Sequence, residues 1–308
     1  MTQQAGPNEE SSTSSVLRQR LDRRAFMTRA AILGATAAAA PVLMGAVGPA
    51  GIGAQPGPPP GRGCPSINPL LVRRYDVTRS EVGIDGAEVD GAPVRIRAYA
   101  AAPIGVDNAP GILVIHENQG LQPYQRDVVD GLATSGYHAV VADLLSREGG
   151  TAIVEDRSGG LSAAPQDRHV EDLQSTLAYL RDQVGSARVG IVGFCFGGAL
   201  TWRMATEADG LSAVVPFYGA APQAIQDAAG EIEAAVFAVY AENDNNVNAT
   251  RDGILAALDA AGVTHETMTY PGTGHAFHNH TREDRYNPQQ AQRAWEDTLA
   301  WFDQHLLA

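Results

Sequence analysis

Short apolar runs alternate with amphipathic segments along most of the chain, and this alternation restricts the fold more than any other feature. Residues 111–115 read G-I-L-V-I, which is typical of a strand buried on both faces of a parallel sheet. Similar strand-like segments occur at residues 138–144, 188–192, 212–217, 234–240 and 266–270. Apolar residues at helical spacing occur at residues 124–135, 169–184, 196–206, 250–261 and 289–307. This order predicts an α/β fold, with a mostly parallel sheet flanked by helices on both faces.

Two further segments have other patterns. Residues 94–100 alternate between apolar and polar side chains, which predicts a half-exposed strand at an edge of the sheet. Residues 148–166 show no clear period, so we expect a long loop there and regard it as a candidate lid.

The chain is acidic, and it contains arginine but no lysine. The formal net charge is −13 over 308 residues, and the 22 positions that carry Lys or Arg are all Arg. An acidic chain without a basic stripe repels phosphate backbones, so nucleic-acid binding is not expected. The lack of lysine excludes a Schiff-base lysine and a phosphate-loop lysine.

The N-terminal segment has the three parts of an export signal. Residues 22–27 read D-R-R-A-F-M, which resembles a twin-arginine motif, and an alanine-rich apolar stretch follows at residues 30–47. Small residues near 50–54 would suit cleavage. We therefore predict three regions: a twin-arginine signal peptide at 1–54, a Pro/Gly-rich linker at 55–74, and one α/β domain at 75–308.

These regions predict a periplasmic or extracellular protein that meets the twin-arginine export machinery during secretion and has no membrane contact after signal removal. A retained membrane anchor is the alternative, but the glycines and alanines of the stretch and Pro41 make it weakly apolar. Lipoprotein processing at Cys64 is disfavoured by Arg62, which stands where a small residue is required. Cys64 and Cys195 are the two cysteines of the chain, and we expect no bond between them.

Residues 188–198 contain the most informative motif. They read R-V-G-I-V-G-F-C-F-G-G, so that a strand leads into a turn and a helix leaves it. This is the nucleophile elbow G-x-S-x-G with Cys195 in place of serine. Gly193 and Gly197 are expected because side chains there would collide with neighbouring elements. The start of the helix would favour a thiolate and offer N–H groups to an oxyanion.

Two other interpretations of this motif stay open at this point. One is a dinucleotide-binding turn, but the glycine spacing is not G-x-G-x-x-G and no acidic residue follows about twenty positions later at a strand end. The other is a buried structural cysteine without a chemical role.

An acid and a histidine follow Cys195 in the order that this kind of site requires. Asp244 comes just after the strand at 234–240, and His275 lies in a glycine-rich loop after the strand at 266–270. The three residues predict nucleophilic catalysis, with His275 as the base and Asp244 fixing the imidazole. Glu242 is the alternative acid.

Other residues near these motifs have candidate roles. The segment H-E-N-Q-G-L at 116–121 follows the strand at 111–115, so the N–H groups of Asn118 and Phe196 are the predicted oxyanion donors. Glu117 would then lie beside the thiol and disfavour its ionised form.

The three histidines His275, His278 and His280 raise the alternative of a metal site. Their spacing H-x-x-H-x-H matches no defined ligand pattern, so we predict no metal and no cofactor. His278 and His280 are expected to be loop or rim residues.

Together these motifs resemble the dienelactone hydrolase family of the α/β-hydrolase superfamily. The resemblance runs from about residue 90 to 306 and rests on five segments: H-E at 116–117, D-L-L-S-R at 143–147, G-F-C-F-G-G at 193–198, A-E-N-D at 241–244 and G-H-A-F at 274–277. The tail, with R-Y-N at 285–287 and A-W at 294–295, resembles an exported subgroup.

The resemblance implies an α/β-hydrolase fold and a triad of Cys195, Asp244 and His275. It also implies that Glu117 gates the nucleophile, holding a neutral thiol until substrate displaces it. Arg147 matches a family arginine that binds the substrate carboxylate. The second such arginine would stand four residues after His275, where this chain has Asn279, so specificity for dienelactone itself is not expected.

The predicted function is therefore hydrolysis of a small-molecule carboxylic ester or lactone through a cysteine acyl-enzyme, of the carboxymethylenebutenolidase type. Two alternatives differ in class. One is acyl transfer from the same acyl-enzyme, and the other is a non-catalytic secreted binding protein on a hydrolase scaffold. An intact triad favours hydrolysis over the binding protein.

Overall fold

The structure is a computed structural model that describes residues 75–89, 92–184 and 188–307. The predicted signal peptide, the predicted linker and Cys64 lie outside the described residues. Within the described ranges, no helix is both long enough and apolar enough to span a membrane.

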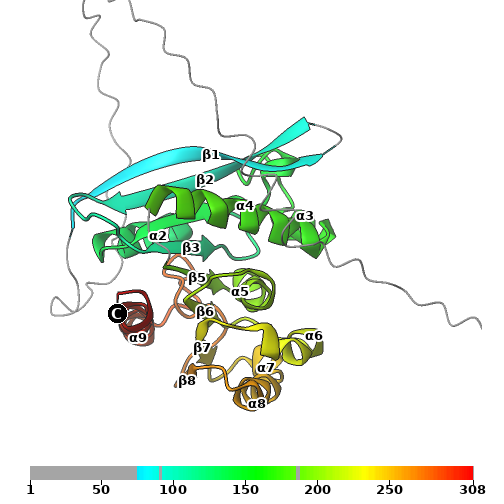
Figure 1. The fold of residues 1–308 in the computed structure, drawn as a ribbon. Coiled ribbons are helices and arrows are strands. Elements are labelled where there is room, and N and C mark those ends of the chain that lie inside the picture. Colours follow the sequence, from blue (N-terminus) through cyan, green and yellow to red (C-terminus); the bar gives the residue numbers. More distant parts are fainter. Residues whose placement is uncertain (1–74, 90–91, 185–187, 308) are drawn as a thin grey trace, which may run out of the picture. The chain divides into compact units, whose positions relative to one another are not determined.

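A single eight-stranded sheet forms the centre of the described domain (Figure 1). Its strands are β1 (Val77–Val89), β2 (Ala92–Pro103), β3 (Gly111–Ile115), β4 (His138–Ala142), β5 (Val189–Phe194), β6 (Ala213–Phe217), β7 (Ala235–Ala241) and β8 (His265–Tyr270). Their order across the sheet is β1-β2-β4-β3-β5-β6-β7-β8. The strands from β4 to β8 in this order pair in parallel, whereas β2 is antiparallel to both β1 and β4. The carboxyl ends of the parallel strands therefore meet at one edge, where sites form in open α/β sheets.

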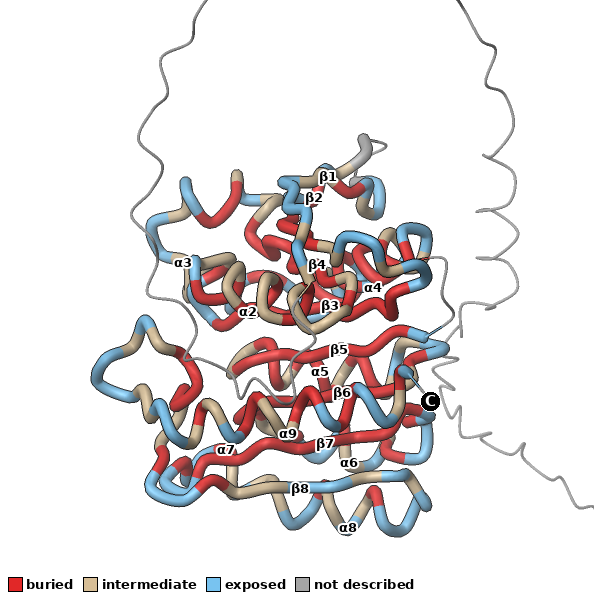
Figure 2. The backbone as a smooth tube through the Cα atoms, turned by 90° about the vertical axis from the view of Figure 1, so that its left-hand side faces the viewer, coloured by how far each residue is buried: buried red, intermediate tan, exposed pale blue. Residues whose placement is uncertain are grey.

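Helices cover both faces of the sheet (Figures 1 and 2). The described helices are α2 (Pro123–Thr134), α3 (Arg157–Ala163), α4 (Gln166–Val184), α5 (Phe196–Glu207), α6 (Gln223–Asp227), α7 (Asn245–Asn248), α8 (Arg251–Ala261) and α9 (Pro288–Leu306), with short 3-10 turns η1 (Ser146–Glu148) and η2 (Ala229–Glu231). The buried side chains of α4, α5 and α8 join one core, and those of α2 and α9 join the other. The mostly parallel sheet flanked by helices on both faces is therefore confirmed.

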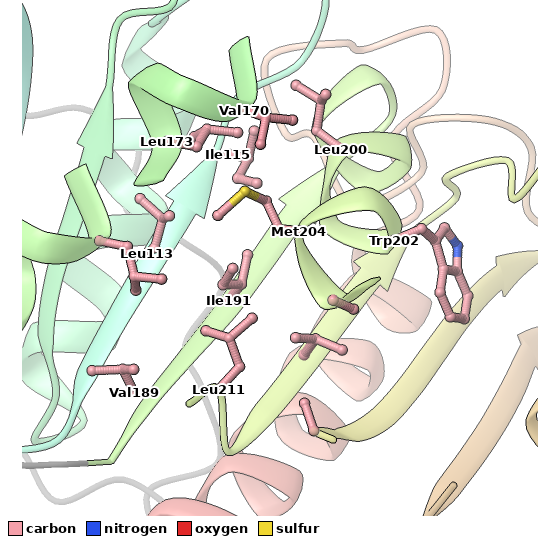
Figure 3. Packing of buried hydrophobic residues seen from close by; sticks show 14 of the residues in the cluster. Leu113, Ile115, Val170, Leu173, Val189, Ile191, Leu200, Trp202, Met204 and Leu211 are labelled. Carbon is pink, nitrogen blue, oxygen red and sulfur yellow. The ribbon is translucent and has the colours of Figure 1, made fainter. Parts of the chain in front are cut away.

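Buried parallel strands supply both cores because successive side chains point to opposite faces. In β3, Leu113 packs toward α4 and α5, while Ile112 and Val114 pack toward α2 and α9. Figure 3 shows Leu113 and Ile191 of neighbouring strands in the same cluster as Met204 of α5. This two-sided burial explains why the central strands read as uninterrupted apolar runs.

Two sequence predictions are corrected by the fold. The strand at 94–100 is not an edge strand, because β1 pairs along β2 and forms the edge itself. The sequence of β1, V-T-R-S-E-V-G-I-D-G-A-E-V, is too polar and too interrupted by glycine to be recognised. The segment 148–166 is not a long structureless loop, because it contains α3, which buries Leu161.

Candidate active site

Cys195 occupies a strained turn between β5 and α5. Its backbone has φ 57° and ψ −112°, and a positive φ is unfavourable for a residue with a side chain. The surrounding chain holds this conformation, since the Cys195 N–H donates to the carbonyl of Phe217 over 3.0 Å. The turn leaves the side chain partly exposed as a free thiol.

The glycines around Cys195 allow three elements to approach one another. A Cβ at Gly193 would collide with the carbonyl of Gly197 and the hydroxyl of Thr201. A Cβ at Gly197 would collide with the carbonyls of Ile115 and His116. The steric requirement expected from the sequence is therefore confirmed, and it brings the loop after β3 against the start of α5.

The structure brings together the three residues predicted to act as a triad. His275 Nε2 lies 2.9 Å from Cys195 Sγ, and His275 Nδ1 lies 2.5 Å from Asp244 Oδ2. Asp244 also caps α7, because its Oδ1 accepts a hydrogen bond from the Val247 N–H at 3.4 Å. The alternative acid Glu242 is exposed, and its Oε2 accepts from the Gly272 N–H over 2.8 Å. Asp244, not Glu242, therefore contacts the histidine.

His275 is placed to hold a proton. Burial lowers its pKa, but hydrogen bonds to Asp244 and Cys195 and the charges of both partners outweigh burial and raise the pKa to about 10. An imidazolium between a Cys195 thiolate and Asp244 is therefore stabilised, so that His275 can take and hold the thiol proton.

The two predicted oxyanion donors are placed on adjacent segments. Asn118 lies in the exposed loop after β3, and Phe196 is the first residue of α5. Within the described chain, neither backbone N–H donates to a backbone carbonyl. The close approach at Gly197 sets these segments side by side, so both N–H groups could serve one oxyanion.

Glu117 is buried next to the triad rather than bonded to the thiol. It is 6% exposed, its Oε2 accepts from Asn279 Nδ2 over 2.6 Å, and its Oε1 lies 3.5 Å from the Tyr218 hydroxyl. No hydrogen bond joins Glu117 to Cys195 among the described residues. Burial raises the pKa of Glu117, and the hydrogen bond from Asn279 and the charge of His275 oppose this only in part.

Two residues of this arrangement were missed as site residues in the sequence. Tyr218 follows β6 with φ 36°, and its ring centroid lies 5.2 Å from that of His275. Asn279 was recognised only as the place of a missing arginine. A tyrosine just after a buried strand was the available signal for Tyr218, but its backbone conformation cannot be read from local sequence.

Arg147 of η1 forms an ion pair with a carboxylate of α4. Its Nη2 lies 2.6 Å from Asp172 Oδ1, and the two side chains are 10% and 1% exposed. Arg147 is therefore not a freely solvated loop arginine, and its role toward a substrate carboxylate stays a prediction.

His278 and His280 face different partners. His278 Nδ1 lies 2.7 Å from the Tyr124 hydroxyl, and burial, with a smaller contribution from His280, lowers the pKa of His278 to about 3. His280 Nε2 lies 3.1 Å from Asp127 Oδ2. His278 lies in the loop after β8, as one of the two predicted positions, but it is a buried, neutral residue and not a rim residue.

Comparison with known proteins identifies the family. Residues 96–306 match the dienelactone hydrolase family. The chain belongs to this family. A predicted carboxymethylenebutenolidase of Methylorubrum extorquens is 33% identical over 228 residues, which cover 69% of this chain and 78% of that protein. Protein usf of Aquifex pyrophilus is 33% identical over 226 residues, which cover 69% of this chain and 95% of that protein.

Solved structures agree with this assignment. A predicted dienelactone hydrolase of Klebsiella pneumoniae has a TM-score of 0.67 and 29% identity, and the match covers 74% of this chain and 99% of that one. A dienelactone hydrolase-like promiscuous phosphotriesterase from metagenomic libraries has a TM-score of 0.65 at 23% identity, covering 74% of this chain and 98% of that one; this likeness concerns the fold alone. This dienelactone hydrolase family member has the α/β-hydrolase fold, and it is a hydrolase acting on ester bonds.

Proposed function

We propose that this protein hydrolyses small carboxylic esters or lactones through a cysteine acyl-enzyme. One observation carries the proposal: His275 contacts Cys195 Sγ with one ring nitrogen and Asp244 with the other, at 2.9 and 2.5 Å. Nucleophile, base and orienting acid in hydrogen-bonding order are the requirement for this chemistry.

The reaction follows from these contacts. With the thiol proton on His275, the Cys195 sulfur attacks the ester carbonyl, and the oxyanion that forms is bound by the N–H groups of Asn118 and Phe196. Collapse expels the alkoxide, which takes the proton from His275 and leaves a thioester. Water then gives a proton to His275 and attacks the thioester, so that the carboxylic acid and the thiolate are released. Asp244 stabilises the imidazolium throughout.

Glu117 is proposed to gate this nucleophile, as the family resemblance implies. Its carboxylate is close enough to His275 for a charge interaction. Because the sulfur contacts His275 and not Glu117, the gate would act through charge rather than through a direct hydrogen bond. An ionised Glu117 disfavours the thiolate, and a substrate that displaces or neutralises it would release the nucleophile.

Substrates that depend on two arginines for a carboxylate are not proposed. Asn279 binds Glu117, and Arg147 is paired with Asp172. We propose Arg147 alone for the substrate-carboxylate role that the resemblance implies, with Asp172 as its partner when no substrate is bound.

The nucleophile is tested by Cys195→Ala. We expect hydrolysis of an aryl ester to fall on the order of 10³-fold or more, with the free energy of unfolding changed by less than about 1 kcal/mol. Mass spectrometry after brief exposure to the ester should find the acyl group on Cys195, and Cys64→Ala should behave as the unchanged protein. Full activity of Cys195→Ala would disprove the proposal. Product analysis with an added amine separates hydrolysis from acyl transfer.

Export by the twin-arginine route is also proposed, with the signal at 1–54, the linker at 55–74 and the folded domain at 75–308. Arg23 and Arg24, followed by Phe26, are the supporting feature. The double change Arg23→Lys and Arg24→Lys should leave precursor in the cytoplasm, while Arg18→Lys with Arg20→Lys, outside the motif, should not. Normal secretion of the first variant would indicate another route.

A further inference from the structure

His116 is the first residue after β3, and its side chain is buried between two backbone segments. The residue is 0% exposed, although it belongs to the loop that carries Glu117 and Asn118. Its main chain lies against the elbow, because a Cβ at Gly197 would come within 2.6 Å of the His116 carbonyl oxygen. This buried histidine, which is not part of the triad, therefore lies where it can control the loop after β3.

Two hydrogen bonds determine the tautomer of the His116 ring. The Leu144 N–H donates to Nε2 over 3.1 Å, so Nε2 carries no proton. Burial lowers the pKa of His116 below its ordinary value, so the ring is neutral. The single proton of the neutral imidazole then lies on Nδ1, and Nδ1 donates to the Glu117 carbonyl over 2.7 Å. The ring therefore ties the loop after β3 to the segment after β4.

The same contact sets the direction of the next N–H group. The peptide unit that joins Glu117 to Asn118 is trans and, like other peptide units, planar, so its carbonyl and its N–H point in opposite directions. The carbonyl accepts from His116 Nδ1 and also from the Gly120 N–H over 3.2 Å. The Asn118 N–H is therefore directed away from the His116 ring. Hydrogen bonds to the carbonyl also polarise the peptide and make its N–H a stronger donor.

We propose that His116 is a positioning residue for the oxyanion: its Nδ1–H holds the peptide between Glu117 and Asn118 so that the Asn118 N–H stays aimed at the developing negative charge. The inference rests on the proposed function, in which Asn118 and Phe196 bind the oxyanion. A donor that is held in place before the reaction stabilises this charge without having to reorganise. A peptide that is free to rotate would lose this advantage.

Two substitutions separate the hydrogen bonds of the ring. The amide of Asn can occupy the place of Nδ1 and donate to the Glu117 carbonyl, whereas the amide of Gln can reach the place of Nε2 and accept from the Leu144 N–H. We expect His116→Gln to lower kcat for an aryl ester about tenfold to a hundredfold, because it loses the bond that holds the peptide. We expect His116→Asn to lower kcat only a few fold. His138→Asn is the control, because His138 lies at the amino end of β4, away from the carboxyl ends of the strands.

Alkylation of Cys195 distinguishes positioning from a general loss of structure. A haloacetamide reacts with the sulfur at a saturated carbon and forms no oxyanion, so its rate should be unchanged in both variants. A trifluoromethyl ketone, whose adduct with the sulfur carries an oxyanion, should inhibit His116→Gln less strongly than His116→Asn. The KM for the ester should change little, because the lost interaction is made mainly in the transition state.

Hydrolysis that is impaired by His116→Gln and largely kept by His116→Asn, with unchanged alkylation, supports the role of His116. A parallel loss of alkylation would overturn it. NMR of the unchanged protein with isotopically labelled histidine does not depend on how the variants fold: a proton on Nδ1 of His116 is expected, and a proton on Nε2 would overturn the inference. No hydrolysis by the unchanged protein would reject the proposed function and this role together, whereas equal hydrolysis by the two variants would reject only the role of His116.

Discussion

At the scale of single residues, Glu117 is the most unusual group in the site. The carboxylate of Glu117 is buried. Its two hydrogen-bonding neighbours, Asn279 and Tyr218, are uncharged. Burial therefore raises the pKa of Glu117, and the nearby charge of His275 opposes the shift. A carboxylate in this setting responds to its surroundings more strongly than one on the surface.

Replacing Glu117 by Gln should change the reactivity of Cys195. Gln keeps an oxygen for Asn279 but removes the negative charge that disfavours a thiolate, so we expect faster alkylation by a small haloacetamide at neutral pH. Turnover of a good ester should fall, because the gate no longer responds to substrate. The measurement is the alkylation rate as a function of pH, with Glu242→Gln as an exposed control.

Identical pH profiles for Glu117→Gln and the unchanged protein would remove Glu117 from the mechanism. Slower alkylation in the variant would show that Glu117 acts mainly by stabilising the imidazolium of His275, and the gating role would be rejected.

At the scale of elements, the junction of β5 and α5 is defined by backbone contact. Glycine is required at this junction, because a Cβ at Gly197 would collide with the carbonyls of Ile115 and His116 at the end of β3. Rigid backbone atoms cannot yield as a flexible side chain can, so the elements themselves would have to separate.

Gly197→Ala should therefore reduce both stability and activity. We expect the free energy of unfolding to fall by about 1 to 3 kcal/mol, and hydrolysis to fall more steeply because the Phe196 N–H moves with α5. Gly230→Ala is the control, since a Cβ at Gly230 in η2 meets nothing within 4 Å. Denaturant unfolding and aryl-ester kinetics measure the two effects. Equal stability of the two variants would contradict the close approach at the elbow.

At the scale of the whole molecule, histidines with shifted pKa values contribute to the way stability varies with pH. Burial lowers the pKa of His116, His138, His169 and His278 below the ordinary value of 6.5. For such groups the unfolded chain binds more protons than the folded chain below pH 6.5, so stability falls as the pH falls. His275 has a raised pKa of about 10, so the stability it contributes is complete below pH 6.5 and is lost as the pH rises toward 10.

The free energy of unfolding should therefore be greatest near pH 6.5. His278, with a pKa of about 3, should remove about 1.4 kcal/mol for each pH unit below 6.5. His278→Asn, which keeps an acceptor for Tyr124, should flatten this acid limb, whereas His265→Asn should not. Denaturant unfolding across the pH range measures both. A stability that stays constant from pH 6.5 down to about pH 4 would contradict the buried, neutral state of His278.

The parallel sheet, the elbow at Cys195 and the order of Asp244 and His275 could all be predicted from the amino-acid sequence. These features depend on local rules: apolar periodicity, the backbone requirement for glycine, and the meeting of parallel strand ends at one edge. The polar strand β1 and helix α3 escaped prediction because their signals are weak and their positions depend on pairing and packing with other elements.

The contacts of the charged side chains could not be predicted from the sequence, because they depend on how the elements pack. Glu117 meets Asn279 across 162 positions of the chain, and Arg147 is held by Asp172 of α4. The motif at 143–147 indicated an arginine for substrate, but it carries no information about a carboxylate on another helix. Charge interactions depend on distance and burial, which are set by the packing of elements far apart in the sequence.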